Sequence, residues 1–355
     1  MNYLLTSSIV MFLLFAGIST PLQAQPDTYA EKLGYPEEAK VLIMHVDDAG
    51  MSWGSNKGTR DAIEKGVANS FSIMMPCPWV PGIAKYVKEH PRSDAGLHLT
   101  LTSEWDDYRW GPLMGKPAVP GLVDREGCFW GSVDQVVEHA SPDEVEAEIR
   151  AQVERALTMG FRPTHLDSHM GTLFADRAFL ERYIKVGADY KIPVMFPGGH
   201  MSFLKEDYRQ ETIRELKESG QWEEGMEVPT PDLLDLAPEM GQNIWSMGLP
   251  VLDDLHNVSY GWEYPGDDNP TDEQLQQFYT EKYIETMDEL EPGLTMVIMH
   301  CTDPSEIFGD ISTSGLRRKG DLLAMTDPAL KQYLEEENII LATWREVMER
   351  REKVN

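Results

Sequence analysis

Apolar runs alternate with segments of helical periodicity along most of the chain. The run at residues 41–46 is rich in branched residues and ends at Asp47, Asp48 and Gly50, a pattern typical of a buried parallel strand whose last residues reach an open mouth. Similar runs follow, with predicted helices between them. Strands are expected at 41–46, 70–75, 95–102, 161–168, 192–196, 293–299 and 339–342, and helices at 56–65, 81–89, 142–159, 176–190, 203–218, 271–290, from 327 onward and at 344–351.

This alternation implies parallel strands joined by right-handed crossovers. A chain of 355 residues can form one barrel or two smaller domains. Two stretches break the alternation: residues 104–131 are irregular and long enough for a lid or a substrate wall, and residues 198–269 hold one predicted helix and otherwise loops. The second stretch has too little apolar periodicity for a core of its own, so we interpret it as an insertion over the mouth.

The first residues of the chain have the pattern of a signal peptide. Residues 1–24 hold an apolar run from Ile9 to Ile18 and then Leu22-Gln23-Ala24, a small-residue cleavage pattern. The run is too short to span a bilayer, and no cysteine follows it to carry a lipid. We therefore expect an exported protein, periplasmic or secreted, without a membrane anchor. Residues 25–39 are expected to form a polar N-terminal arm.

Charge narrows the choice of partner. Acidic side chains outnumber basic ones by 60 to 31, which gives a formal net charge of −29. Such a surface repels phosphate backbones and anionic lipids, so we expect neither nucleic acid nor a membrane to be a partner. The charge favours a neutral or cationic substrate. The three cysteines, Cys77, Cys128 and Cys301, leave at least one thiol unpaired, so we infer no disulfide framework.

Four chemically active side chains lie at or near the ends of predicted strands: Asp48, His98, His169 and His300. In barrels of alternating strands and helices, the carboxyl ends of the strands carry the chemistry. Two imidazoles and one carboxylate suit a catalytic divalent ion that keeps an open position. In the competing interpretation, each histidine is a hydrogen-bonded structural residue and the Asp47-Asp48 pair caps the next helix. The coincidence of four strand ends favours the metal site.

The motifs around these residues also occur together in one known family. In order they are Val46-Asp47-Asp48-Ala49-Gly50, Ala95-Gly96-Leu97-His98-Leu99-Thr100 and Arg162-Pro163-Thr164-His165-Leu166-Asp167-Ser168-His169, followed by Met299-His300 and Thr326-Asp327-Pro328. With these motifs, the chain resembles the YdjC-like carbohydrate deacetylases over roughly residues 40–349 apart from the insertion.

The resemblance implies a single domain at residues 40–352, with an α/β fold: a distorted barrel of parallel strands like that of the polysaccharide deacetylases. It also implies that Asp48, His98 and His169 bind one divalent metal ion, Zn²⁺ or Mg²⁺. Asp47 then becomes the general base and His300 the general acid. The reverse assignment of the two aspartates stays open at this point.

The resemblance suggests further contacts around this centre. Asp167 is expected to orient His98 or His169 as an outer carboxylate. Loop residues Trp53 and Trp105 are candidates to stack on sugar rings, because indoles pack against apolar pyranose faces. Arg317 and Arg318 are candidates to steady the intermediate, and Arg317 is a candidate to contact the substrate, although arginines at a surface turn are the more common case.

Two departures from the family pattern concern the wall of the site. The chain has His45 where the family typically has asparagine, and Met170-Gly171-Thr172 where the family often has further histidines. The predicted metal ligands are all present, but the surroundings differ. The family's chitooligosaccharide substrate therefore cannot be transferred to this chain.

The predicted function is metal-dependent removal of an acetyl group from an N-acetylated or O-acetylated sugar. One alternative is another metal hydrolase on the same barrel, such as an amidohydrolase or a phosphoesterase. A two-metal amidohydrolase usually has His-x-His at the first strand, where this chain has Asp47-Asp48. A second alternative is a sugar-binding protein without catalysis, which the retained carboxylates and histidines disfavour. A metal-independent glycosidase with two carboxylates is a third, and a chelator would not inhibit it.

Overall fold

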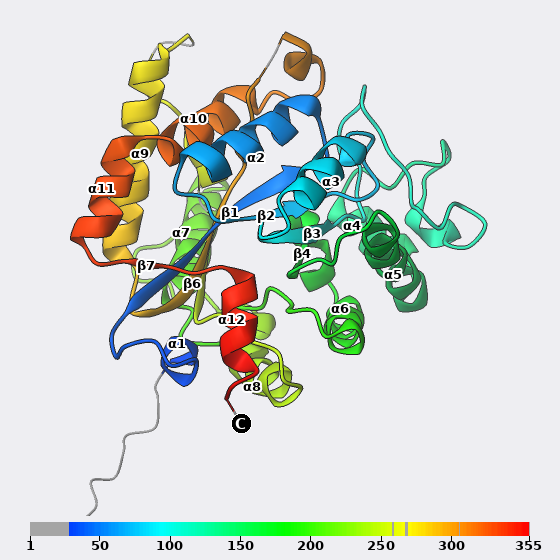
Figure 1. Cartoon of the computed structure of the whole chain (residues 1–355), viewed down its shortest axis with the longest axis horizontal. Helices are drawn as coiled ribbons and strands as arrows, with labels where there is room; N and C mark the ends of the chain where they lie inside the picture. Colours follow the sequence, from blue (N-terminus) through cyan, green and yellow to red (C-terminus); the bar gives the residue numbers. More distant parts are fainter. Residues whose placement is uncertain (1–27, 258, 267–268, 305, 355) are drawn as a thin grey trace, which may run out of the picture.

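The computed structural model describes residues 28–354 except 258, 267–268 and 305 (Figure 1). The predicted signal peptide at residues 1–24 lies outside the described residues. Within the described part of the chain, no helix combines the length and the apolarity that crossing a bilayer requires. All three cysteines are free thiols.

A curled parallel sheet forms the centre of the molecule, with β1 in its middle (Figure 1). The strand order is β4-β3-β2-β1-β6-β5, and β7 pairs with the first half of β1. All the strand pairs are parallel, as the sequence predicts. The strands are β1 (Lys40–Ala49), β2 (Ser70–Ile73), β3 (Ala95–Leu99), β4 (Leu166–Ser168), β5 (Asp254–His256), β6 (Gly293–Met299) and β7 (Ile340–Leu341).

The open side of this curled sheet is bridged by the segment at residues 193–198. Leu166 in β4 donates its backbone N–H to Pro193 O at 2.8 Å, and Leu252, just before β5, donates to Phe196 O at 3.0 Å. The strand predicted at 192–196 is thus present only as isolated bridges between the two ends of the sheet. The prediction of a parallel α/β fold with a curled, barrel-like sheet is confirmed.

Helices cover the outside of the sheet, and most of them lie where the sequence predicts (Figure 1). The helix after Ser141 begins with a capping box, in which Ser141 and Glu144 exchange hydrogen bonds with each other's backbone. The helices that match predictions are α2 (Trp53–Lys65), α3 (Val80–Glu89), α5 (Pro142–Thr158), α6 (Arg177–Tyr190), α7 (Ser202–Glu218), α9 (Asp272–Glu289), α11 (Pro328–Glu336) and α12 (Trp344–Arg351).

The structure corrects the expectation of loops after α7. Residues 232–246 form a helix, α8 (Asp232–Ser246), although Pro238 lies inside it, and residues 254–256 form strand β5 of the main sheet. Proline and short length hid these two elements, since both weaken the local signal. Three further helices were not predicted: α1 (Tyr29–Lys32), α4 (Val133–His139) and α10 (Gly315–Met325).

The interior of the curled sheet changes from apolar to polar along β1. Val41 and Ile43 lie in an apolar cluster with side chains of β6 and with Trp344 of α12. Two residues further along the same face, His45 is fully buried, and Asp47 follows it. The alternate residues Leu42, Met44 and Val46 belong to the outer core beneath the helices. Because successive side chains of a strand alternate, β1 separates an apolar base from a polar upper layer.

His256 of β5 is a buried histidine without a polar role. Its ring stacks on Phe203 at 4.9 Å and lies edge-on to Trp262 at 6.1 Å, and neither ring nitrogen has a hydrogen-bond partner among the described residues. Burial lowers the pKa of His256 to about 4. The imidazole therefore acts as a neutral aromatic ring in the folded protein.

We expect this histidine to make the fold sensitive to acid. The pKa of His256 in the folded state lies below the ordinary value of about 6.5, so between these two values the unfolded chain is protonated at His256 and the folded chain is not. The free energy of unfolding therefore falls as the pH drops from about 6.5 to about 4. The loss amounts to about 3 kcal/mol at most. Urea unfolding at pH 7.5 and pH 4 should show that His256→Phe gains about this much relative to wild type at the lower pH.

The exposed residue His90 supplies the control, since His90→Phe should keep the pH dependence of the wild type. An equal pH dependence in wild type and His256→Phe would contradict the assignment.

Candidate active site

A local distortion at the end of β1 brings two adjacent carboxylates to the same mouth. The register with β2 shifts between Val46 and Ala49, and Asp48 has a φ of 65°, in the left-handed region. In a regular strand Asp47 and Asp48 would point to opposite faces. Here both reach His98: Asp47 Oδ1 lies 3.7 Å from His98 Nδ1, and Asp48 Oδ1 lies 3.4 Å from His98 Nε2.

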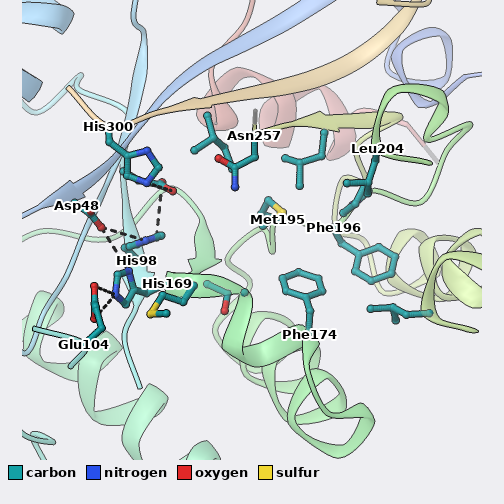
Figure 2. Close-up of a pocket in the computed structure, with 18 of the residues that line it drawn as sticks. Asp48, His98, Glu104, His169, Phe174, Met195, Phe196, Leu204, Asn257 and His300 are labelled. Atoms are coloured by element: carbon teal, nitrogen blue, oxygen red, sulfur yellow. Dashed lines mark hydrogen bonds and ion pairs between the residues drawn. The ribbon is translucent and has the colours of Figure 1, made fainter. Parts of the chain in front are cut away.

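The three predicted metal ligands converge on one point (Figure 2). Asp48 Oδ1 lies 3.4 Å from His98 Nε2 and 3.5 Å from His169 Nδ1. The side chains come from β1, from β3 and from the residue after β4, and all three are buried. Their ligand atoms lie within 4.8 Å of one another, so the group can hold a metal ion.

Two outer carboxylates orient the imidazoles of this group. His98 Nδ1 donates to Asp167 Oδ1 at 2.6 Å, which leaves Nε2 as the acceptor nitrogen facing Asp48. His169 Nε2 lies 3.1 Å from a carboxylate oxygen of Glu104, which leaves Nδ1 facing Asp48. Histidine ligands of metals usually donate their second N–H to such a carboxylate. Asp48 Oδ1 has no hydrogen-bond partner among the described residues, so the donor set fits a cation.

The electrostatics of the group also favour a cation. Burial acts to lower the pKa of His169, but the carboxylates of Glu104 and Asp48 outweigh it and raise the pKa to about 10. Burial likewise opposes the charge of Asp48, yet Arg318 and His169 hold its pKa well below the ordinary value. The metal-free cluster therefore retains a proton that a divalent ion would displace.

Two other groupings of buried side chains are less suitable. His45, His165 and Asp167 also bring ligand atoms together, but His45 uses both ring nitrogens on Ser70 and Ser72, at 2.9 and 3.1 Å. The combination of Asp47, His98 and Asp167 would need the nitrogen of His98 that already bonds to Asp167. Only the group with Asp48, His98 and His169 has all its members on the cavity at the mouth.

Asp47 and His300 face each other beside this group. Asp47 Oδ1 accepts a hydrogen bond from Ser72 Oγ at 3.2 Å and lies 3.1 Å from His45 Nε2. Its second oxygen, Oδ2, lies 4.0 Å from His300 Nε2. Burial and then Arg318 lower the pKa of His300 to about 4, so its ring is neutral at pH 7. His300 is held in place by its backbone N–H, which donates to Asp321 Oδ2 at 2.9 Å.

The residues proposed to contact substrate divide into two groups. Trp105 lines the cavity of about 450 Å³ in which the metal group, Asp47 and His300 lie. Trp53, at 49% exposure, and Arg317 do not line it. The neighbouring Arg318 does, and its Nη1 donates to Asp48 Oδ2 at 2.6 Å. Asp48 thus keeps only Oδ1 for a cation.

Sequence reasoning did not assign a role to Glu104. It opens the irregular stretch after β3, outside every motif, and its carboxylate becomes significant only because the chain folds back onto His169. In the sequence, the only indication of a role for Glu104 is that its carboxylate lies six residues after His98, which ends a predicted strand.

Comparison with known proteins places the chain in a family. Residues 41–336 match the family model described as YdjC-like protein. The chain belongs to the YdjC-like family. A relative from Thermus thermophilus named carbohydrate deacetylase is 29% identical over 87% of this chain and 94% of its own length. A carbohydrate deacetylase from Brevibacillus brevis is 35% identical over 44% of this YdjC-like chain, and that match spans only 59% of the relative.

A solved structure supports the fold. A crystal structure from Enterococcus faecalis V583, described as a candidate cellobiose-phosphate cleavage protein, superposes with a TM-score of 0.63. The match covers 86% of the YdjC-like chain and 98% of the other, at 20% sequence identity. At this identity the likeness establishes the common fold alone.

We expect metal binding to depend on both the ligands and their outer carboxylates. In isothermal titration calorimetry with Zn²⁺ on metal-free protein, His98→Ala should abolish binding, because it removes a ligand. Glu104→Gln should weaken binding by about 10- to 100-fold, because it releases the ring of His169. Affinity in the wild type should rise with pH over the range in which Zn²⁺ stays in solution, since the raised pKa of His169 means that its ring must lose a proton before Nδ1 can bind the ion.

Glu126→Gln is the matched control, because Glu126 is exposed in the same irregular stretch. It should bind Zn²⁺ as the wild type does. Equal zinc affinity in wild type and His98→Ala would refute the site.

Proposed function

We propose that this YdjC-like protein is a metal-dependent carbohydrate deacetylase that removes an acetyl group from an N-acetylated or O-acetylated sugar. The observation that supports this proposal is the convergence of Asp48, His98 and His169 on one point of a cavity, with Asp47 and His300 beside them. The Thermus thermophilus relative, named carbohydrate deacetylase, supports the proposal over 87% of this chain.

The metal group would hold one divalent ion, Zn²⁺ or Mg²⁺, through Asp48 Oδ1, His98 Nε2 and His169 Nδ1. When bound, such an ion polarises an acyl carbonyl and lowers the pKa of a water molecule toward about 7. Arg318 occupies the other oxygen of Asp48, which keeps that carboxylate monodentate and charged. Asp167 and Glu104 keep the two imidazoles in the required tautomers.

The contacts of the two aspartates support the proposed division of their roles. Asp48 faces both histidines of the metal group, whereas Asp47 turns its Oδ2 toward His300. Asp47 is therefore the general base, and Asp48 is the ligand. Ser72 and His45 hold the other oxygen of Asp47, so Oδ2 is the atom left to take the proton of the attacking water.

His300 is neutral before the reaction, because its pKa is about 4. It must therefore gain a proton before it can act as an acid. Asp47 Oδ2, 4.0 Å away, takes that proton from water and passes it to His300 Nε2, which delivers it to the departing nitrogen of an amide or oxygen of an ester. The pair thus moves one proton from the nucleophile to the leaving group.

The proposal extends to location and substrate charge. Residues 1–24 support export to the periplasm or the exterior, and residues 40–352 a single catalytic domain. The net charge of −29 supports a neutral sugar substrate and disfavours a phosphoesterase, whose substrate is anionic.

Removal of the base should separate chemistry from metal binding. Asp47→Asn should reduce kcat for acetate release from acetylated amino sugars by about 10³-fold, because it removes the carboxylate proposed to take the proton of the water and pass it to His300. Zn²⁺ affinity and KM should stay close to wild type. The measurements are acetate release from a panel of N- and O-acetylated sugars, and zinc titration of the same samples.

Asp134→Asn, at an exposed position on α4, should keep full activity. The deacetylase assignment would be contradicted if the wild-type protein bound zinc but released no acetate from any member of the panel. That outcome would favour another metal hydrolase.

A further inference from the structure

His45 of β1 contacts both halves of the proposed catalytic centre. Its side chain is fully buried and lies on the same face of the strand as Asp47. His45 Nε2 lies 3.1 Å from Asp47 Oδ1 and 3.0 Å from Asp167 Oδ2. Asp47 is the proposed general base, whereas Asp167 orients the candidate metal ligand His98 through a contact of 2.6 Å. One imidazole nitrogen therefore joins the base to an outer carboxylate of the metal group.

The contact between His45 and Asp167 crosses the interior of the curled sheet. His45 lies on β1 and Asp167 on β4, and β2 and β3 lie between these two strands in the sheet. Asp167 Oδ2 has no hydrogen-bond partner among the described residues. The ring nitrogen Nε2 of His45, at 3.0 Å, and that of His165, at 3.5 Å, face this oxygen. Loss of the His45 ring would leave a buried carboxylate oxygen with little compensation, which is costly.

Two serines of β2 fix the ring of His45. Its Nδ1 lies 2.9 Å from Ser70 Oγ and its Nε2 lies 3.1 Å from Ser72 Oγ, and both serines are fully buried. Ser70 pairs with His45 in the register of the sheet, and Ser72 faces the same side because it lies two residues further along the strand. The hydroxyl of Ser72 also donates to Asp47 Oδ1 at 3.2 Å. The ring is therefore held in one orientation, with Nε2 directed at the two carboxylates.

The charges around His45 favour a proton on Nε2. Burial acts to lower the pKa of His45, but Asp167 and Asp47 outweigh it and raise the pKa to about 9, so the ring is a cation at pH 7. His165 lies edge-on to His45, with 4.9 Å between the ring centres. It does not compete for the proton, because burial and the charge of His45 lower the pKa of His165 despite Asp167. An imidazolium donates from both nitrogens, so Nε2 can serve the two carboxylates.

We propose that His45 is a positioning residue that couples the general base to the metal group, because its Nε2–H holds Asp47 Oδ1 and Asp167 Oδ2 together. The inference rests on the proposed function for the role of Asp47. Without this N–H, Asp167 would hold the ring of His98 less firmly, and the metal would bind more weakly. Asp47 would lose one of the contacts that leave its Oδ2 directed at the water.

Two substitutions of His45 test this role. An asparagine amide nitrogen lies near the place of Nδ1 and falls short of the carboxylates, whereas a glutamine amide nitrogen reaches the place of Nε2. In zinc calorimetry on metal-free protein, His45→Asn should lower affinity by about tenfold, because the orientation of His98 is relaxed. It should also lower kcat for acetate release by about 10- to 100-fold with little change in KM, because the base is misplaced. His45→Gln should recover most of both losses, since it restores an N–H near Nε2.

A double-mutant cycle tests whether His45 acts on the metal through Asp167. Asp167→Asn alone should weaken zinc binding by about 10- to 100-fold, because it removes the outer carboxylate of His98. In that background, His45→Asn should cost less than about a further twofold, because the contact that it removes is already lost. Additive losses in the double variant would overturn the coupling. His256→Phe is the matched control, since it replaces another buried histidine of the sheet, and it should keep the zinc affinity and kcat of the wild type.

A measurement on the wild type keeps the test decisive if His45→Asn does not fold. Nuclear magnetic resonance of the zinc-loaded protein with ¹⁵N-labelled histidine reports the protonation of each ring nitrogen, and the signals of His45 are those missing from His45→Gln. Nε2 should carry a proton at pH 7. An unprotonated Nε2 would overturn the inference, because the nitrogen could not donate to either carboxylate.

The zinc and resonance measurements do not depend on acetate release. The predicted loss of zinc affinity in a wild-type background that releases no acetate would support the contact with Asp167 and count against the proposed deacetylase. Acetate release and zinc affinity that are both unchanged in folded His45→Asn would overturn the inference and leave the proposed function standing.

Discussion

The structure depends on the burial of several carboxylates at one end of a barrel. Asp47, Asp48 and Asp167 are each almost fully buried, and removing a carboxylate from water is costly unless cations or hydrogen-bond donors replace the solvent. Here the compensation comes from imidazoles, a serine hydroxyl and one guanidinium. Asp167 accepts a hydrogen bond from His98. Asp48 accepts one from Arg318, and Asp47 accepts one from Ser72. Asp48 Oδ1 has no hydrogen-bond partner among the described residues, so the same constraint that shapes the mouth also leaves a buried group that could hold a metal ion.

This polar layer is supported from below by the apolar base of the barrel. His165 stacks on Trp344 at 5.3 Å, and its ring lies where a Cβ on Gly96 would be only 2.3 Å away. Glycine two residues before His98 is therefore a packing requirement, because any side chain there would displace His165. The position of the candidate metal ligand His98 on β3 is thus linked, through close packing, to Trp344 of α12.

Above the polar layer, the walls of the site come from separate parts of the chain. Residues 104–131 bring Glu104 and Trp105 to the metal side, while α7 and α8 bring leucines to the other side. The strand ends therefore supply the candidate metal ligands, and the connections supply most of the remaining wall of the cavity.

The sequence alone determined most of the strands and helices, their parallel pairing and the candidate residues Asp48, His98 and His169. It could do so because periodicity and strand-end motifs are local signals. Only the tertiary structure decided that Glu104 orients His169, that of the two candidate arginines Arg318 lines the cavity, and that α7 and α8 supply apolar side chains to its wall. These contacts join residues that are distant in sequence, so no local pattern encodes them. The left-handed backbone at Asp48, which turns both aspartates to one mouth, belongs to the same class, because it follows from the strand register.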